Sequence, residues 1–283
     1  MLIIEWIKWL YEKIIFEWFF ERGAETTWLA PKYPNGVGGA WGLLHILVIV
    51  FCAATIVGLF FIYKFSKNKE KAKKIILISL ASTIALFEIL IRFLYLMKRY
   101  YFANPNYNYM DVFWIMMPKP WCAISCWLAI ACPIVNKKFF YNLTCISGLI
   151  CTFIYFLYPG VGYNYIIFND FYSLATHAVL LITSISLITL KFTEFKYKHI
   201  WKVAIGFVLI YAYSFIEIFV FKFPHHGDPL YFMPNGDIQG IIKGIIPSFG
   251  YAHYLILYIF FVLTFINSFY LFSLIKKKNK TNK

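Results

Sequence analysis

The sequence predicts an all-α fold, a polytopic membrane protein with a seven-helix transmembrane bundle behind an N-terminal interfacial helix. Two observations lead to this prediction. The 283 residues are 61% hydrophobic and only 14% charged, more apolar surface than a soluble domain of this size can bury. The apolar residues also gather in runs long enough to cross a bilayer, which takes about 20 residues of helix. These runs leave no room for a separate soluble domain.

The first 38 residues are predicted to form an interfacial amphipathic helix and an outer loop. Glu5, Lys8 and Glu12 share one face at helical spacing, among tryptophan, phenylalanine and aliphatic residues. Glu5, Glu12 and Glu17 argue against a cleavable signal peptide, because the apolar centre of such a peptide carries no charge.

Residues 39–275 are predicted to form the transmembrane domain. Its expected spans are 39–63, 75–97, 111–135, 139–157, 171–190, 203–221 and 251–275. Pro118 and Pro120 interrupt the third run, because proline disfavours a continuous helix at and just before its own position. The third helix is therefore expected to start at Asp111 or at Pro120, and the choice sets the depth of Cys122.

The net charge of +14 comes from lysines that gather in alternate connections and in the tail. They are Lys64, Lys67, Lys69, Lys71, Lys73, Lys74, Lys137, Lys138, Lys191, Lys196, Lys198, Lys202, Lys276, Lys277, Lys278, Lys280 and Lys283. Lysine-rich short loops stay cytoplasmic, which predicts a cell-membrane protein with its N-terminus outside and residues 276–283 as a basic cytoplasmic tail. The expected partners are membrane lipids, not nucleic acid, and the sequence leaves the oligomeric state open.

Six ionisable or nucleophilic side chains lie inside the predicted spans, in the halves nearest the outer face. They are His45, Glu88, Arg92, Cys122, His177 and Glu217. Such groups are costly in hydrocarbon and usually serve a function or a specific partner. Counting about 1.5 Å per residue from the outer helix ends places them at similar depth. We therefore predict a polar pocket that opens toward the outer leaflet.

Cys122 is the predicted nucleophile of this pocket, since a histidine partner converts a thiol into the reactive thiolate. His177 is expected to remove the thiol proton and later to protonate the leaving group. His45 or Glu217 would orient His177, which completes a predicted catalytic set of four side chains.

The predicted substrate-binding residues are Arg92, Glu88, His225 and His226. Glu88 and Arg92 stand four residues apart and can form an ion pair within one helix. Alternatively, Arg92 holds a phosphate or carboxylate, which its forked guanidinium suits. His225 and His226 lie in the last outer loop, where they could form a lid or a metal site. The six cysteines contain no CxxC pair, and no metal or other cofactor is predicted.

Four segments resemble motifs of a known family. They are GAWGLLH, which ends at His45; MPKPWC, which ends at Cys122; LATH, which ends at His177; and GDPLYFM, at 227–233. In order and spacing they resemble the YwaF-like family of multi-pass bacterial membrane proteins, which is related to a eukaryotic cysteine-dependent phospholipid acyltransferase. Pro120 stands where the family has a histidine before the cysteine, and the last loop lacks the family's asparagine. The resemblance implies the membrane architecture, and it places Cys122 at the position of the family's cysteine.

The leading functional hypothesis is a lipid-directed acyltransferase or acyl hydrolase with a Cys–His site in the outer half of the bilayer. One alternative is a transporter or sensor with a polar His/Glu/Arg cavity, in which buried groups relay protons. A further alternative is an intramembrane metal-dependent hydrolase that uses His45, His177 and Glu217, since two histidines and a carboxylate can hold zinc with one open position.

Overall fold

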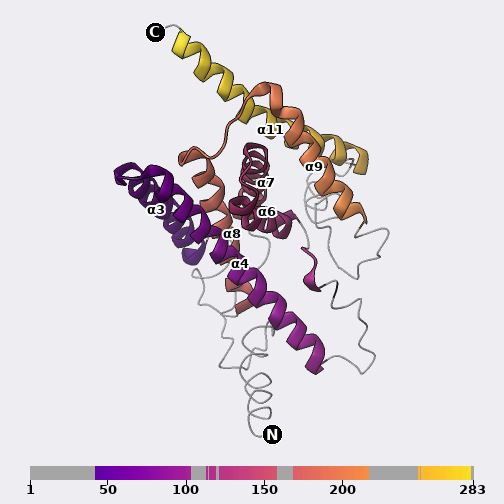
Figure 1. Ribbon diagram of the computed structural model, residues 1–283. Helices are drawn as coiled ribbons and strands as arrows, with labels where there is room; N and C mark the ends of the chain where they lie inside the picture. The colour runs from indigo at the N-terminus through magenta and orange to yellow at the C-terminus, as the bar shows by residue number, and fades with distance from the viewer. Residues whose placement is uncertain are drawn as a thin grey trace. The chain divides into compact units, whose positions relative to one another are not determined.

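The computed structural model describes residues 42–102, 113, 115–118, 121–157, 168–216, 248 and 250–281, and these residues contain helices and no strand (Figure 1). The helices are α3 (Leu43–Phe65), α4 (Lys69–Phe102), α6 (Trp121–Val135), α7 (Lys138–Leu157), α8 (Phe168–Thr189), η2 (Tyr197–His199), α9 (Ile200–Phe215) and α11 (Tyr251–Thr281). Each of the seven predicted spans coincides in part with one of the seven α-helices given above for the described residues. The predicted interfacial helix within residues 1–38 lies outside the described residues.

Four of these helices are long and apolar enough to cross a membrane, which confirms the helical membrane fold. The qualifying segments are Leu43–Phe65, Lys69–Leu96, Lys138–Leu157 and Phe171–Thr189. The apolar stretches Cys122–Val135 and Ile256–Leu271 are shorter. A complete set of seven crossings remains a prediction.

The structure distinguishes between the two starts expected for the third helix, and it extends the last helix beyond the end of its predicted span. The run 111–135 is not one helix, because the chain bends at Met117, Pro118 lies outside any helix, and α6 begins at Trp121. Proline disfavours the helical conformation in the residue before it, which explains the break. At the other end, α11 continues to Thr281, since lysine is a good helix former and no glycine or proline interrupts it.

Local sequence sets the helix ends. Asn68 caps α4: its side-chain oxygen accepts a 2.9 Å hydrogen bond from the backbone N–H of Lys71. Asn136 separates α6 from α7 and adopts a left-handed conformation with φ of 49°, which asparagine tolerates better than most residues. Its side-chain oxygen accepts a 2.7 Å hydrogen bond from the Tyr141 hydroxyl, which fixes the turn of this α6–α7 hairpin.

The described helices divide into two compact units. The first unit contains α3, α4, the end of α7 from Thr152 and α8 up to Ser186. The second contains α6, α7 up to Cys151, the end of α8, η2, α9 and α11.

The first unit buries one side of α3. Only His45 and Cys52 of this helix are buried, whereas apolar side chains such as Val50, Phe51 and Ile62 are exposed. Exposed apolar residues on a membrane helix are suited to contact lipid. The buried side packs into a cluster made by Cys52, Phe156, Leu174, Ala178 and Ile182.

In the second unit, polar side chains of α7 form hydrogen bonds with the backbone of the connection after α8. The Asn142 amide of α7 donates a 2.9 Å hydrogen bond to the backbone oxygen of Glu194 and accepts a 3.0 Å bond from the Glu194 N–H. Lys138 donates a 3.0 Å hydrogen bond to the backbone oxygen of Phe192. These bonds attach the connection after α8 to the start of α7. Helices α9 and α11 run against each other (Figure 1).

Candidate functional site

Cys122 lies in the first turn of α6, where Pro118 and the bend at Met117 place the helix start. The first backbone N–H groups of a helix have no partner within the helix, and the N-terminus carries a partial positive charge. Both effects favour a thiolate at this position. The Cys122 side chain is half-buried, so it is not sealed within the second unit. A 3.1 Å hydrogen bond from the Tyr213 hydroxyl to the Pro118 oxygen anchors the segment just before α6.

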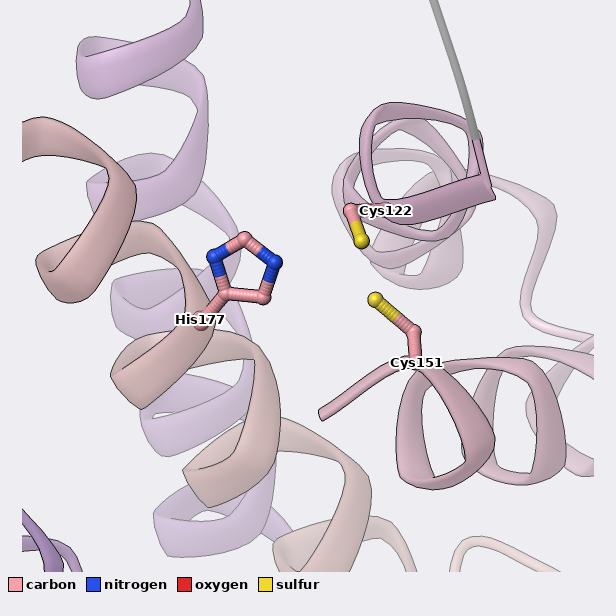
Figure 2. A group of neighbouring side chains, drawn as sticks. All are labelled: Cys122, Cys151 and His177. Atoms are coloured by element: carbon pink, nitrogen blue, oxygen red, sulfur yellow. The ribbon is translucent and has the colours of Figure 1, made fainter. Parts of the chain in front are cut away.

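Cys151 of α7 lies opposite Cys122 in the second unit. Their sulfur atoms lie within 4.8 Å of one another, and Figure 2 shows them turned toward each other from α6 and α7. Neither cysteine takes part in a disulfide bond, and Cys151 is buried. Figure 2 also labels His177 of α8, which belongs to the first unit.

His177 is held in one orientation by its own helix and by the end of α7. Its Nδ1 lies 2.6 Å from the backbone oxygen of Ser173, one helical turn earlier. A carbonyl oxygen only accepts hydrogen bonds, so Nδ1 carries the hydrogen and Nε2 is the basic nitrogen of the neutral ring. The ring stacks on Tyr155 with a centroid distance of 3.5 Å and an interplanar angle of 7°. The Tyr155 hydroxyl in turn lies 3.1 Å from the Ser173 hydroxyl.

His45 joins the same row of rings. It is fully buried and stacks on Phe156 with a centroid distance of 5.9 Å. Phe156 meets Tyr155 edge to face at 5.4 Å, so four rings run from His45 through Phe156 and Tyr155 to His177. The equal depth of the two histidines in the membrane remains a prediction. In the part of the chain that the structure describes, His45 belongs to no group of three metal-ligating side chains.

Glu88 and Arg92 form the ion pair that their spacing predicts, and both are buried. Arg92 Nη1 also donates a 3.0 Å hydrogen bond to the Glu88 backbone oxygen, and its Nε donates a 3.3 Å bond to the Met116 oxygen. The Tyr172 hydroxyl donates a 2.8 Å hydrogen bond to the other Glu88 carboxylate oxygen. The pair thus stabilises both charges in an apolar surrounding and joins α4 to α8. Binding of a lipid phosphate by Arg92 remains a prediction.

The remaining predicted site residues fall elsewhere. Glu217, His225 and His226 lie outside the described residues. Cys122 belongs to the second unit and His177 to the first, and their pairing remains a prediction.

Sequence reasoning missed Cys151, Tyr155 and Ser173. A signal for Cys151 exists in the hairpin: Cys122 lies fourteen residues before Asn136, and Cys151 lies fourteen after Lys137. Equal distances from the turn give equal heights in an antiparallel helix pair. Ser173 stands four residues before His177, a spacing that shares one helix face.

Comparison with known proteins identifies the family. The family model described as the TMEM164 family matches residues 40–266. The chain belongs to the TMEM164 family. Together with the apolar helices, membership of the TMEM164 family shows an integral membrane protein. The match runs from the residue after Gly39 into α11, so it includes every predicted site residue. The YwaF-like assignment and its link to acyl transfer stay predictions. No curated protein and no solved structure matches the chain.

Proposed function

We propose that this protein is a lipid-directed acyltransferase or acyl hydrolase of the outer leaflet. Cys122 is its nucleophile and His177 its general base. The observation that carries the proposal is the orientation of His177, whose Nδ1–H is engaged by the Ser173 carbonyl so that Nε2 is the basic nitrogen. A histidine held in one tautomer by its second nitrogen is the usual design of a catalytic base.

The environment of His177 also favours its role as a proton carrier. The ring becomes an imidazolium when Nε2 accepts a proton. An aromatic face stabilises such a cation by about 0.5–2 kcal/mol, and Tyr155 lies stacked against the ring. The Ser173 carbonyl oxygen, at the negative end of its dipole, favours the same charged state.

In the proposed reaction, the Cys122 sulfur attacks the ester carbonyl carbon of a phospholipid while His177 Nε2 takes the thiol proton. The carbon–oxygen bond to glycerol then breaks, and the departing alkoxide takes the proton back from Nε2. The acyl group is left as a thioester on Cys122. An acceptor hydroxyl or water attacks this thioester, with His177 again accepting the proton, and the carbon–sulfur bond breaks to restore the thiol.

The position of Cys122 supplies a second element of this mechanism. Negative charge develops on the carbonyl oxygen at each attack, and backbone N–H groups at a helix start can stabilise it. The first turn of α6 carries Cys122 itself, so these donors lie next to the nucleophile.

The test uses the full-length protein in liposomes that contain phospholipid with a labelled acyl chain. Cys122→Ala and His177→Asn should each abolish acyl release. Cys126→Ala is the matched control, because it removes a buried thiol one turn further along the same helix face and should retain activity. Elution of each variant as a monodisperse peak shows that it is folded. Wild-type rates in folded Cys122→Ala would refute the thiol mechanism.

A second candidate function, a transporter or sensor, is favoured by the buried network of Glu88, Arg92 and Tyr172. Buried ionisable residues in membrane helices often serve ion or proton pathways. On this reading, proton-coupled uptake into liposomes should be lost in Glu217→Gln and retained in Cys122→Ala, the reverse of the acyl-transfer result.

A further inference from the structure

The two facing thiols of the α6–α7 hairpin are the most reactive arrangement that the proposed chemistry leaves unexplained. The Cys122 and Cys151 sulfur atoms lie within 4.8 Å of one another (Figure 2). The proposed reaction assigns no role to Cys151. A disulfide bond is about 2.05 Å long, so the sulfurs must approach by less than about 3 Å to form one. Both thiols come from the same hairpin, whose connection is only Asn136 and Lys137.

The hairpin keeps the two cysteines in register. Each lies fourteen residues from the turn, and the turn is fixed by the left-handed Asn136 and its hydrogen bond with Tyr141. Nearer the turn, the Cys132 thiol lies 3.2 Å from the Thr144 hydroxyl, so α6 and α7 are in side-chain contact along the hairpin. A persistent juxtaposition of two thiols favours disulfide formation, because little chain entropy remains to be lost.

The two thiols are not equivalent. Cys122 is half-buried at a helix N-terminus, where a thiolate is favoured and a reagent can approach. Cys151 is 5% exposed and lies inside α7, six residues before its end. Cys122 therefore suits the attacking role in thiol–disulfide exchange, and Cys151 suits the resolving role.

We propose that Cys122 and Cys151 are a redox pair that closes to a reversible intramolecular disulfide by exchange with a small-molecule disulfide. The Cys122 thiolate attacks one sulfur of that compound, and the first thiolate leaves with the electron pair of the broken bond. Cys151 loses its proton and attacks the Cys122 sulfur of the mixed disulfide, which releases the second thiolate. The protein loses two electrons and two protons, and the small disulfide is reduced to two thiols.

The regulatory consequence of the Cys122–Cys151 redox pair rests on the proposed function. A Cys122 sulfur held in a disulfide cannot attack an ester, so oxidation would switch acyl transfer off and reduction would restore it. The pair itself is independent of that function, because its formation depends only on the hairpin.

Cys126 is the competing partner for Cys122, because it lies one turn further along the same helix. Residues four apart on a helix have Cβ atoms about 5–6 Å apart, whereas a disulfide needs about 3.5–4.5 Å. An undistorted α6 therefore disfavours a bond between Cys122 and Cys126, and the facing Cys151 is the preferred partner.

The test treats the reduced full-length protein in nanodiscs with 4,4′-dithiodipyridine, an apolar disulfide, and follows peptide masses. In wild type, Cys122 and Cys151 should be recovered as one cross-linked peptide pair that dithiothreitol separates. In Cys151→Ser, Cys122 should instead retain a thiopyridyl group. Cys126→Ser is the matched control and should behave like wild type. A stable thiopyridyl adduct on wild-type Cys122, or a Cys122–Cys126 cross-link, would overturn the redox pair.

Activity separates this inference from the proposed function. If both hold, oxidised wild type loses acyl release and regains it with dithiothreitol, while reduced Cys151→Ser is as active as reduced wild type. If the Cys122–Cys151 cross-link forms but acyl release does not depend on Cys122, the redox pair stands and the proposed function fails. If acyl release depends on Cys122 but no cross-link forms, the proposed function stands and the redox pair fails.

Discussion

Gly206 of α9 provides a close approach to α7, and adding one methyl group there should destabilise the second unit. A Cβ at this position would lie 2.7 Å from both Cδ1 and Cδ2 of Leu143 and 3.2 Å from its Cγ. Carbon atoms pack best at about 3.5–4.0 Å, so the leucine methyl groups would have to move by roughly 1 Å. Rotating the Leu143 side chain to exchange its two methyl groups does not relieve the clash, because both methyl groups lie against the added Cβ. Leu143 is 5% exposed and has little room to adjust.

The expected change in the free energy of unfolding follows from two opposing effects of Gly206→Ala. Overpacking of a core costs about 1–3 kcal/mol. Alanine favours a helix over glycine by about 1 kcal/mol. The free energy of unfolding should therefore fall by about 0–2 kcal/mol. Gly58→Ala in α3 is the matched control: a Cβ there meets nothing within 4 Å, so the variant should show the helix gain alone. The difference between the two variants isolates the clash, at about 1–3 kcal/mol.

The assay is unfolding of each purified variant in mixed detergent micelles, followed by circular dichroism. A double-mutant cycle with Leu143→Ala adds the decisive comparison. Leu143→Ala alone should cost about 2–5 kcal/mol by leaving a cavity. The added methyl of Gly206→Ala should be tolerated in that background, so the two changes should couple by about 1–3 kcal/mol. Equal stabilisation by Gly206→Ala and Gly58→Ala, with strict additivity in the cycle, would refute the close approach.

Three further predictions concern polar contacts. Arg92→Met should destabilise the protein by about 3–5 kcal/mol because it leaves the Glu88 carboxylate buried without its cation, and adding Glu88→Gln should recover part of the loss in the same unfolding assay. Asn142→Ala should cost about 1–3 kcal/mol through its two hydrogen bonds with the Glu194 backbone, and an unchanged unfolding midpoint would contradict this. The hydrogen bond from Lys196 lowers the pKa of Glu194, so its small stabilising contribution is complete above the ordinary carboxyl pKa and is lost as pH falls through the lowered value. An NMR titration of Glu194 should therefore shift upward in Lys196→Gln, and an unmoved titration would show that Lys196 is not the cause.

The sequence predicted the location of the helices along the chain well, because helices that cross a membrane are apolar along their whole length. The features that it left open depend on local stereochemistry and not on hydropathy. An apolar run cannot reveal on which side of Pro118 a helix begins, and the bend at Met117 decides it. The lysines after Ile275 predict a polar tail, yet they continue α11 because lysine is compatible with a helix.

The candidate site was predictable in part for a similar reason. Rare polar residues in apolar spans are conspicuous, and the Glu88–Arg92 pair follows from its spacing alone. Tyr155 was not conspicuous among the 22 tyrosines, because its importance lies in a stacking contact between α7 and α8 that spacing along one helix does not reveal. Cys151 was one of six cysteines, and only the turn at Asn136 and Lys137 distinguishes it from the others.

The most direct test of the central claim is a search for the acyl-enzyme itself. Full-length protein in nanodiscs is mixed with phospholipid carrying an isotopically labelled acyl chain, quenched with acid within the first turnover, digested and examined by mass spectrometry. The account predicts a labelled acyl group on the Cys122 peptide, sensitive to hydroxylamine as a thioester is, and absent in His177→Asn. Release of labelled acyl chains with Cys122 unmodified at every time point would contradict it.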